Sequence, residues 1–237
     1  KPLSIGSICI ACKGFEPNTQ KLNHTVIEEE INNCSIAVLS GPSFAKEVAS
    51  GLPTAITIAS KDIKIAQDFS SLFHSDIFRT YVHSDYIGVQ IAGAVKNVMA
   101  IAAGISDGLG FGSNARSALI TRGLAEIIRL GISIGAKQET FLGLAGLGDL
   151  ILTCTDNQSR NRRLGLLLAE GLSVKQACEK INQEIEGLNT AKEVGALAKK
   201  NNIEMPITEQ VINVIESKCS AKDAVQNLLN REQKIEA

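Results

Sequence analysis

The sequence predicts an α/β layer followed by an all-helical domain, with the change between residues 83 and 84. In residues 1–83, strand-like runs rich in Val and Ile alternate with helical patterns, which is typical of an α/β layer. From residue 84 onward we find no convincing strand, and helical patterns follow one another. A chain of 237 residues is long enough for two modest domains of this kind.

The first domain, residues 1–83, is expected to alternate strand and helix. Its short β-branched runs suit a sheet that is covered on both faces. The expected strands are Ser7–Cys12, Ser35–Leu39, Thr54–Ala59 and Phe78–Val82. The expected helices between them are Gln20–Ile31, Ser43–Ala49 and Asp62–Phe73.

The second domain, residues 84–237, is expected to consist of helices joined by short connections. The expected helices cover residues 85–106, 114–135, 138–144, 159–170, 173–181, 189–201, 208–216 and 220–231. Hydroxyl and amide side chains stand where N-caps are expected, at Ser173, Thr208, Ser220 and Asn114. Gly135 and Gly171 stand where a helix is expected to end.

The bulk composition argues against nucleic-acid and membrane-surface proteins. Hydrophobic residues make up 44% of the chain, charged residues 21%, and the net charge is -1. Residues 85–106 are long and apolar enough to test as a membrane span. A lysine inside a span costs roughly 2.5–3.5 kcal/mol on insertion scales, and Lys96, Gln90 and Asn97 lie near the centre of this segment. We therefore expect a core helix and no membrane span.

The cysteines and histidines do not predict a metal site. Cys9 and Cys12 form a CxxC pair, but residues three apart on a strand point to opposite faces. The six cysteines lie mostly in apolar surroundings and are expected as buried, reduced thiols. The three histidines lack metal-ligand spacing. Reduced thiols and no signal peptide predict a cytoplasmic protein. Because the chain begins at Lys1 and soon enters an apolar strand, we expect the later part of a longer protein.

Lys96 is the only charged residue between Tyr86 and Ser106. A lysine on an apolar helix often buries its stem and extends its ammonium group to water. Here its neighbours are small, so another element or a ligand can come close. A partly dry cleft lowers the pKa of an ammonium group, which suits proton transfer near neutral pH. Asn97, the next residue, favours a site at which Lys96 stabilises an oxygen anion.

Lys13 and Asp149 are the candidate partners of this lysine. Lys13 and Gly14 follow the first strand, and ligands of open α/β sheets bind outside the carboxyl ends of strands; an ordinary turn lysine is the alternative. Asp149 is a lone carboxylate in the glycine-rich segment 143–155. That segment lies among helices, so it is not a dinucleotide-binding fingerprint. Buried charges need partners, and we expect Asp149 to pair with Lys96 or Lys13.

Ser159, Arg160 and Asn161 open a helix whose later turns are apolar. Free backbone N–H groups, a hydroxyl, a guanidinium fork and an amide together suit an anion, and phosphate above all. The alternative is a solvated helix start capped by Asn157 or Ser159. Arginines at this end oppose the helix dipole, which favours the anion site.

Long motifs then resemble one enzyme family over essentially the whole chain. They are KGFE, SGPSFAKEVASGLPTA, GVQIAGAVKNVMAIAAGISDGLGFGSNARSALITRGLAE, LAGLGDLILTCTDNQSRNRRLG and EMPIT. Together they look like the bacterial NAD(P)-dependent glycerol-3-phosphate dehydrogenases. The resemblance implies the C-terminal part of a Rossmann domain (residues 1–83) and a helical domain similar to that of 6-phosphogluconate dehydrogenase (residues 84–237).

The resemblance also implies roles for individual residues. Lys96 becomes the proton donor or acceptor, with Lys13 and Asp149 completing the catalytic group. The substrate-binding residues implied are Lys13, Gly41, Ser43, Lys96, Asn97, Asp149, Ser159, Arg160 and Asn161. The cofactor-binding residues implied are Lys13, Ala45, Arg160, Glu184 and Glu186, for NAD or NADP. No metal is implied. Glu184 departs from the family pattern, because an apolar residue is expected at this position near the cofactor.

A larger departure concerns the glycine loop. The GxGxxG loop of the family is expected upstream of Lys1, so the isolated 237 residues are expected to bind nicotinamide cofactor poorly or not at all. The expected reaction interconverts sn-glycerol 3-phosphate and dihydroxyacetone phosphate and supplies phospholipid synthesis. A small phosphorylated substrate and a homodimer are expected, and no nucleic acid.

Two alternatives stay open at the level of sequence. One is a related β-hydroxyacid dehydrogenase acting on a carboxylate substrate, against which the SRNRR cluster favours phosphate. The other is a non-catalytic helical dimerisation module.

Overall fold

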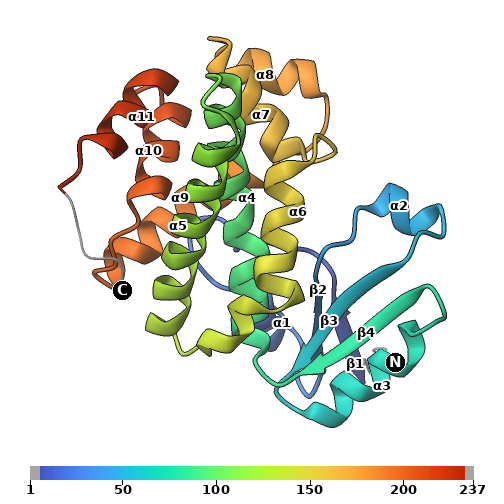
Figure 1. Ribbon diagram of the computed structural model, residues 1–237. Helices are drawn as coiled ribbons and strands as arrows, with labels where there is room; N and C mark the ends of the chain where they lie inside the picture. The colour runs from blue at the N-terminus through green and yellow to red at the C-terminus, as the bar shows by residue number, and fades with distance from the viewer. Residues whose placement is uncertain (1–5, 233–237) are drawn as a thin grey trace.

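The computed structural model describes residues 6–232 and places a four-stranded sheet beside a bundle of helices (Figure 1). The strands are β1 (Ser7–Ile10), β2 (Ser35–Ser40), β3 (Thr54–Ser60) and β4 (Phe78–His83). They lie side by side in the order β1-β2-β3-β4. All four expected strands are confirmed, although β1 ends two residues earlier than expected, at Ile10.

The sheet is mixed. β1 pairs with β2 and β3 with β4 in parallel, whereas β2 and β3 are antiparallel. The connection between β2 and β3 contains only the short helix α2 (Ala45–Ala49). Since β1 and β2 run parallel, their carboxyl ends lie at the same edge, and the segments that follow them, with Lys13 and Ser43, come together there.

Helices cover both faces of the sheet, as expected. α3 (Ile63–Phe73) contributes Ala66 to an apolar cluster with Ala37, Ile56 and Ile58 on one face. On the other face, residues of the strands pack with side chains of the helical bundle. This second cluster consists of Ile10, Val38, Ala59, Val89 and Ala145, with Ile27 from α1 (Asn23–Glu30) packed against it.

The rest of the described chain is helical, as expected. The α-helices are α4 (Tyr86–Gly108), α5 (Gly112–Ser133), α6 (Asp149–Thr155), α7 (Arg160–Ala169), α8 (Val174–Ile181), α9 (Glu186–Lys200), α10 (Pro206–Ile215) and α11 (Ala221–Leu229). Between α5 and α6 lie a 3₁₀ turn, η1 (Gln138–Leu142), and a π-helical turn, η2 (Leu144–Gly148). The α6 helix was not predicted, because glycines dominate the segment before it, and α9 begins three residues earlier than predicted.

The expected helix ends are partly right. Ser173 and Ser220 each form a capping box, and Gly135 and Gly171 follow their helices with φ of 93° and 89°. Thr208 is not an N-cap.

The remaining cap predictions were wrong by one to three residues. The α10 helix begins earlier, at Pro206, and the buried Glu126 carboxylate accepts the N–H groups of Ile207 and Thr208 instead. Asn114 lies inside α5, and α2 starts at Ala45 after Phe44 rather than at Ser43.

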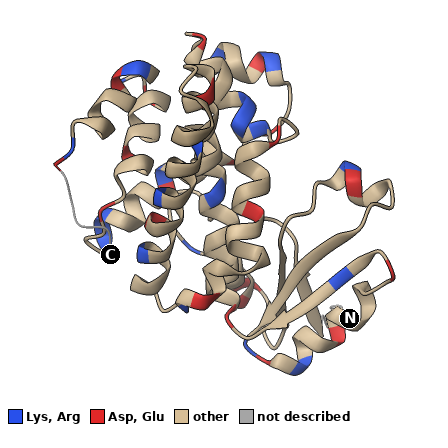
Figure 2. Cartoon of the chain, in the orientation of Figure 1, with Lys and Arg blue, Asp and Glu red and all other residues tan. Residues whose placement is uncertain are grey.

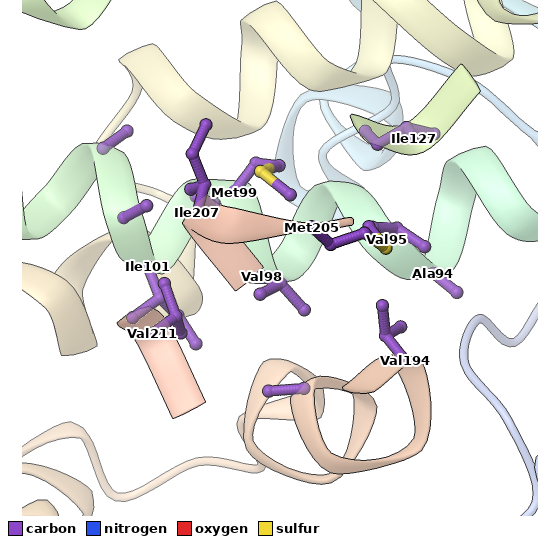
Figure 3. Close-up of a cluster of buried hydrophobic side chains, with 14 of the residues drawn as sticks. Ala94, Val95, Val98, Met99, Ile101, Ile127, Val194, Met205, Ile207 and Val211 are labelled. Atoms are coloured by element: carbon purple, nitrogen blue, oxygen red, sulfur yellow. The ribbon is translucent and has the colours of Figure 1, made fainter. Parts of the chain in front are cut away.

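The α4 helix forms the centre of the bundle. Its residues from Gly88 to Ser106 are all buried. Figure 3 shows Val95, Val98 and Met99 of α4 facing apolar side chains of the C-terminal helices. By length and composition α4 is apolar enough to cross a membrane, but 94% of that window is buried inside the protein, as in a core helix. Figure 2 shows residues of both charges interspersed along the helices of the bundle.

Asp85 fixes the beginning of α4. One oxygen of its carboxylate accepts the N–H of Gly88 at 2.8 Å. The other accepts the N–H of Lys137 at 2.8 Å and the hydroxyl of Thr140 at 2.6 Å. These bonds tie the first turn of α4, just beyond the sheet, to the η1 segment. They also fix where α6 begins, a few residues after η1.

Two glycines let α4 and α7 approach each other closely. A Cβ on Gly104 would overlap the carbonyl oxygen of Arg162, and one on Gly165 would overlap the carbonyl oxygen of Ile101. The helices therefore touch through their backbones at this crossing. The crossing brings the start of α7, at Arg160, toward the middle of α4.

Substitution of Gly104 by Ala is expected to lower the stability of the protein markedly. The new methyl group has no room, so the helices must separate, and overpacking of this kind typically costs about 1–3 kcal/mol. The Tm is expected to fall by roughly 2–12 °C, measured by thermal unfolding. Gly143→Ala is the control, because its added Cβ meets nothing nearer than 3.5 Å. An unchanged Tm in Gly104→Ala would contradict the close crossing.

Candidate active site

Three charged groups from distant parts of the chain meet at the junction of sheet and bundle. Asp149, the first residue of α6, is only 1% exposed. Its Oδ2 accepts a hydrogen bond from the Nζ of Lys13 at 2.6 Å, and its Oδ1 accepts one from the Nζ of Lys96. Asp149 therefore bridges both lysines, where the sequence analysis expected one or the other.

The local fold before α6 presents the Asp149 carboxylate. The π-helical turn η2 ends directly before this residue, and π-turns in helices are frequent at functional sites. Gly146 within η2 packs against the backbone of Phe141, where a Cβ has no room. Asp149 then occupies the first turn of α6, where the helix dipole favours a negative charge.

Thr153 completes the group and was missed by the sequence analysis. It lies one turn after Asp149 on α6, and its hydroxyl donates to the Asp149 carbonyl at 2.6 Å. The same oxygen accepts a hydrogen bond from Lys96 at 2.9 Å. The spacing of four residues is the only signal in the sequence, and it becomes visible once a helix is assigned to this segment.

Lys96 is 7% exposed, so its ammonium group is buried rather than extended to water. Burial, together with the nearby ammonium of Lys13, lowers the pKa of Lys96 from 10.5 to about 8, against the opposing effect of the Asp149 carboxylate. A group with this pKa is able both to give and to take a proton near neutral pH.

A second polar cluster adjoins the first, on three helices. Asn97, next to Lys96 on α4, donates from Nδ2 to a carboxylate oxygen of Glu186 at 3.0 Å. Asn161 on α7 accepts the N–H of Gly187 at 2.9 Å through Oδ1. Both asparagines thus bond to the first turn of α9, and the Asn161 side chain is held with its NH₂ group left to donate.

Arg160 is set apart from the two arginines that follow it. Arg162 lies 2.8 Å from the Asp107 carboxylate, and Arg163 donates to Gln183 at 3.1 Å. Within residues 6–232, the half-buried Arg160 guanidinium has no ion-pair or hydrogen-bond partner. Ser159 is the N-cap of α7 and accepts the N–H of Arg162. The structure thus combines the cap with an unpaired guanidinium that suits an anion.

The edge of the sheet supplies the other wall. Gly41 has a φ of 146°, and a Cβ there would lie 3.0 Å from Ile56 Cα, so glycine is needed. The Ser43 hydroxyl donates to the Gly41 carbonyl at 3.1 Å, and Ala45 is exposed at the start of α2. Gln158, just before α7, donates to Glu47 of α2 at 2.7 Å and so connects the two sides.

A narrow cavity lies at the carboxyl ends of β1 and β2, and the residues around it leave essentially no room for a water molecule. Its lining residues are Cys12, Lys13, Gly14, Asn23, Val38, Leu39, Ser40, Val89, Gln90 and Gly93. Among the predicted site residues, Lys13 lines this cavity directly. Glu184 is exposed in the loop before α9, so it is the predicted residue with the least structural support.

The cysteines differ from expectation. Only Cys154 is buried, and Cys12 is exposed, because β1 ends at Ile10 and the chain has left the sheet before residue 12. Burial raises the pKa of Cys154 to about 12 and that of Cys9 to about 11, which leaves both thiols protonated at neutral pH. All six cysteines are free, and residues 6–232 contain no group of three acidic, His or Cys residues placed to hold a metal.

Family models match both parts of the chain. Residues 85–226 match the model of the NAD-dependent glycerol-3-phosphate dehydrogenase C-terminus, and residues 5–66 match that of the N-terminus. The chain belongs to the NAD-dependent glycerol-3-phosphate dehydrogenase family.

Known relatives are similar in sequence over most of the chain. A glycerol-3-phosphate dehydrogenase [NAD(P)+] of Pseudoalteromonas translucida is 57% identical over 228 residues, 95% of this chain and 68% of that protein. One from Haemophilus influenzae is 56% identical, over 93% of this chain and 67% of that protein.

Solved structures of the family share the fold. A glycerol-3-phosphate dehydrogenase of Coxiella burnetii has a TM-score of 0.92 at 52% identity, covering 95% of this chain and 69% of that one. The enzyme of Saccharomyces cerevisiae has a TM-score of 0.82 at 31% identity, covering 94% and 67%. The expected α/β layer followed by a helical domain is therefore confirmed as the architecture of this family.

Asp149→Asn is expected to destabilise the protein by about 3–5 kcal/mol, because it leaves two ammonium groups without their shared counter-charge. Chemical denaturation measures the loss. Adding Lys96→Met to Asp149→Asn removes one of the two ammonium groups left without a counter-charge. The double variant is therefore expected to recover part of the lost stability. Glu170→Gln, on an exposed carboxylate 3.9 Å from Lys180, is the control and is expected to change stability by less than about 0.5 kcal/mol. Equal stability of Asp149→Asn and the control would refute a buried bridge.

Proposed function

We propose that this chain forms the substrate-binding and proton-transfer part of an enzyme that interconverts sn-glycerol 3-phosphate and dihydroxyacetone phosphate with NAD or NADP. One observation carries the proposal: a single buried carboxylate, Asp149, holds two ammonium groups together beside a cavity at the sheet edge. Family membership supports the reaction, since relatives over 50% identical are named glycerol-3-phosphate dehydrogenase [NAD(P)+].

Lys96 is the proton donor and acceptor in this proposal. In the direction of reduction, negative charge develops on the ketone oxygen, and the Lys96 ammonium stabilises that charge and delivers a proton to the oxygen. In the reverse direction the neutral amine takes the hydroxyl proton. With a pKa of about 8, Lys96 populates both forms near neutral pH, so raising the pH above 8 favours oxidation and lowering it favours reduction.

Asp149, Thr153 and Lys13 hold the reacting ammonium in place. Asp149 and Thr153 together accept two hydrogen bonds from Lys96, which fixes the direction of its remaining N–H. Lys13 lies on the other side of the same carboxylate, and we propose that it contacts substrate and cofactor. Because each amine faces the same carboxylate, the positive charge of Lys13 acts on Lys96 and lowers the Lys96 pKa.

The phosphate group of the substrate is proposed to bind at the start of α7. Arg160 supplies an unpaired guanidinium, Asn161 its NH₂ group, and Ser159 lies beside the free N–H groups of the helix. Asn97, adjacent to Lys96, connects this end of the site with the proton-transfer end. Binding energy at the remote phosphate orients the carbon that reacts.

The described residues fit a nicotinamide cofactor at the sheet edge. The cavity there is lined by both aliphatic and polar residues and contains a buried hydroxyl, that of Ser40, without a protein partner among residues 6–232. NAD or NADP, when bound, supplies or accepts the hydride. We propose that Lys13, Ala45, Arg160, Glu186 and Glu184 contact it, together with Gly41 and Ser43 on the substrate side.

The division into domains 1–83 and 84–237, the homodimer, the cytoplasmic location and the supply of phospholipid synthesis stay predictions. Of the alternatives, a non-catalytic module gives no reason for burying the charges of Lys96 and Asp149 together, because such groups are often no more stabilising than apolar replacements. A carboxylate-acting dehydrogenase differs in substrate, and comparing turnover of dihydroxyacetone phosphate with that of a β-keto acid in the full-length protein separates the two.

Lys96→Met in the full-length protein is expected to lower turnover of dihydroxyacetone phosphate by about 10²–10⁴-fold, the usual contribution of a general acid. The fold should persist, because Asp149 keeps Lys13 as a partner. Steady-state kinetics and circular dichroism measure the two effects. Lys175→Met, at an exposed lysine of α8, is the matched control and should leave turnover unchanged. Near-wild-type turnover in the Lys96 variant would remove this residue from the mechanism.

A further inference from the structure

Ser40, the last residue of β2, carries a buried hydroxyl that the proposed mechanism does not use. The residue is 2% exposed, and within residues 6–232 its Oγ has no hydrogen-bond partner. Buried polar groups are almost always hydrogen-bonded, and leaving one unsatisfied costs about 1–3 kcal/mol. A hydroxyl in this state calls for a partner from outside the protein.

Ser60 on the neighbouring strand β3 shows what a structural serine looks like here. It is also 2% exposed, and its hydroxyl donates to the Ile36 carbonyl at 2.6 Å. Both serines are therefore equally buried in the same sheet. Only Ser60 uses its hydroxyl to hold the sheet together.

The Ser40 hydroxyl lies beside the proton-transfer group. Ser40, Lys13 and Gly93 line the same cavity at the carboxyl ends of β1 and β2. A Cβ on Gly93 would lie 2.9 Å from Ser40 Oγ and 3.5 Å from Lys13 Cδ, so the hydroxyl and the lysine stem both pack closely against this glycine. A ligand bound beside Lys13 therefore lies next to this hydroxyl.

The chemistry of the cavity selects an uncharged group. Its walls combine Val38 and Val89, which disfavour a charge, with the uncharged polar residues Asn23 and Gln90. The Lys13 ammonium is already paired with Asp149, so no free cation remains here for an anion. The phosphate site proposed above uses Arg160, at the start of α7, which does not line this cavity.

We propose that Ser40 is a ligand-binding residue of the dehydrogenase site, whose hydroxyl hydrogen-bonds an uncharged polar group of the bound ligand. This rests on the proposed function. The group has two possible sources: the carboxamide of a nicotinamide ring or the hydroxyl of the three-carbon substrate. In either case, the hydroxyl destabilises the free protein and contributes only when the ligand is bound.

The test compares Ser40→Ala with Ser60→Ala in the full-length protein. Thermal unfolding without ligand gives the stability, fluorescence titration with NADH alone gives the cofactor affinity, and KM for glycerol 3-phosphate reports on the substrate. Ser40→Ala is expected to match or exceed the wild-type Tm and to weaken binding about 3–10-fold, the loss of one hydrogen bond. Ser60→Ala is expected to lower the Tm and leave binding unchanged.

The arms of the experiment distinguish the two sources. Weaker NADH binding assigns the partner to the carboxamide, whereas a raised KM with unchanged NADH binding assigns it to the substrate. The proposal is overturned if Ser40→Ala lowers the Tm as Ser60→Ala does, or if it binds both ligands as the wild type does. If the wild type itself binds neither ligand, the proposed function fails and the assignment of Ser40 fails with it.

Discussion

The burial of Asp149 between two ammonium groups is the interaction on which the site depends. An isolated carboxylate at 1% exposure would cost several kcal/mol, and so would an isolated buried lysine. The buried charges of Asp149 and Lys96 are tolerated because each has an oppositely charged partner, and Lys13 gives Asp149 a second one. They come from the sheet edge, the core helix and a short helix after a π-turn, and their meeting joins the α/β layer to the bundle.

The surrounding structure explains how the three groups meet. Asp85 ties the start of α4 to the segment leading into α6, so the distance between Lys96 and Asp149 is set by hydrogen bonds at one end. Near the other end of α4, the contact of Gly104 with the backbone of α7 sets the distance between these two helices. The phosphate-binding and proton-transfer ends of the proposed site therefore share one rigid helix, which holds a substrate in a fixed orientation.

Much of this could be predicted from the sequence, because buried charges must be paired. That rule alone predicts that Asp149 pairs with Lys96 or Lys13, although these residues lie far apart in the chain. It did not reveal α6, since the glycines before it carry no helical pattern, and Thr153 was missed for that reason. Ser40 was equally invisible, because a strand serine looks the same in the sequence whether its hydroxyl is satisfied or not. Cys12 was misplaced because the end of β1 is set by its pairing with β2.

An NMR titration of Lys96 in the full-length protein tests the central claim most directly. With ¹³Cε-labelled lysine, the resonance absent from a Lys96→Arg variant is followed as the pH rises from about 6 to about 11, across the ordinary lysine range. A buried amine that shares the Asp149 carboxylate with Lys13 predicts a midpoint of about 8. A midpoint near 10.5, the ordinary value, would contradict the account, in which burial and the Lys13 ammonium outweigh the effect of Asp149.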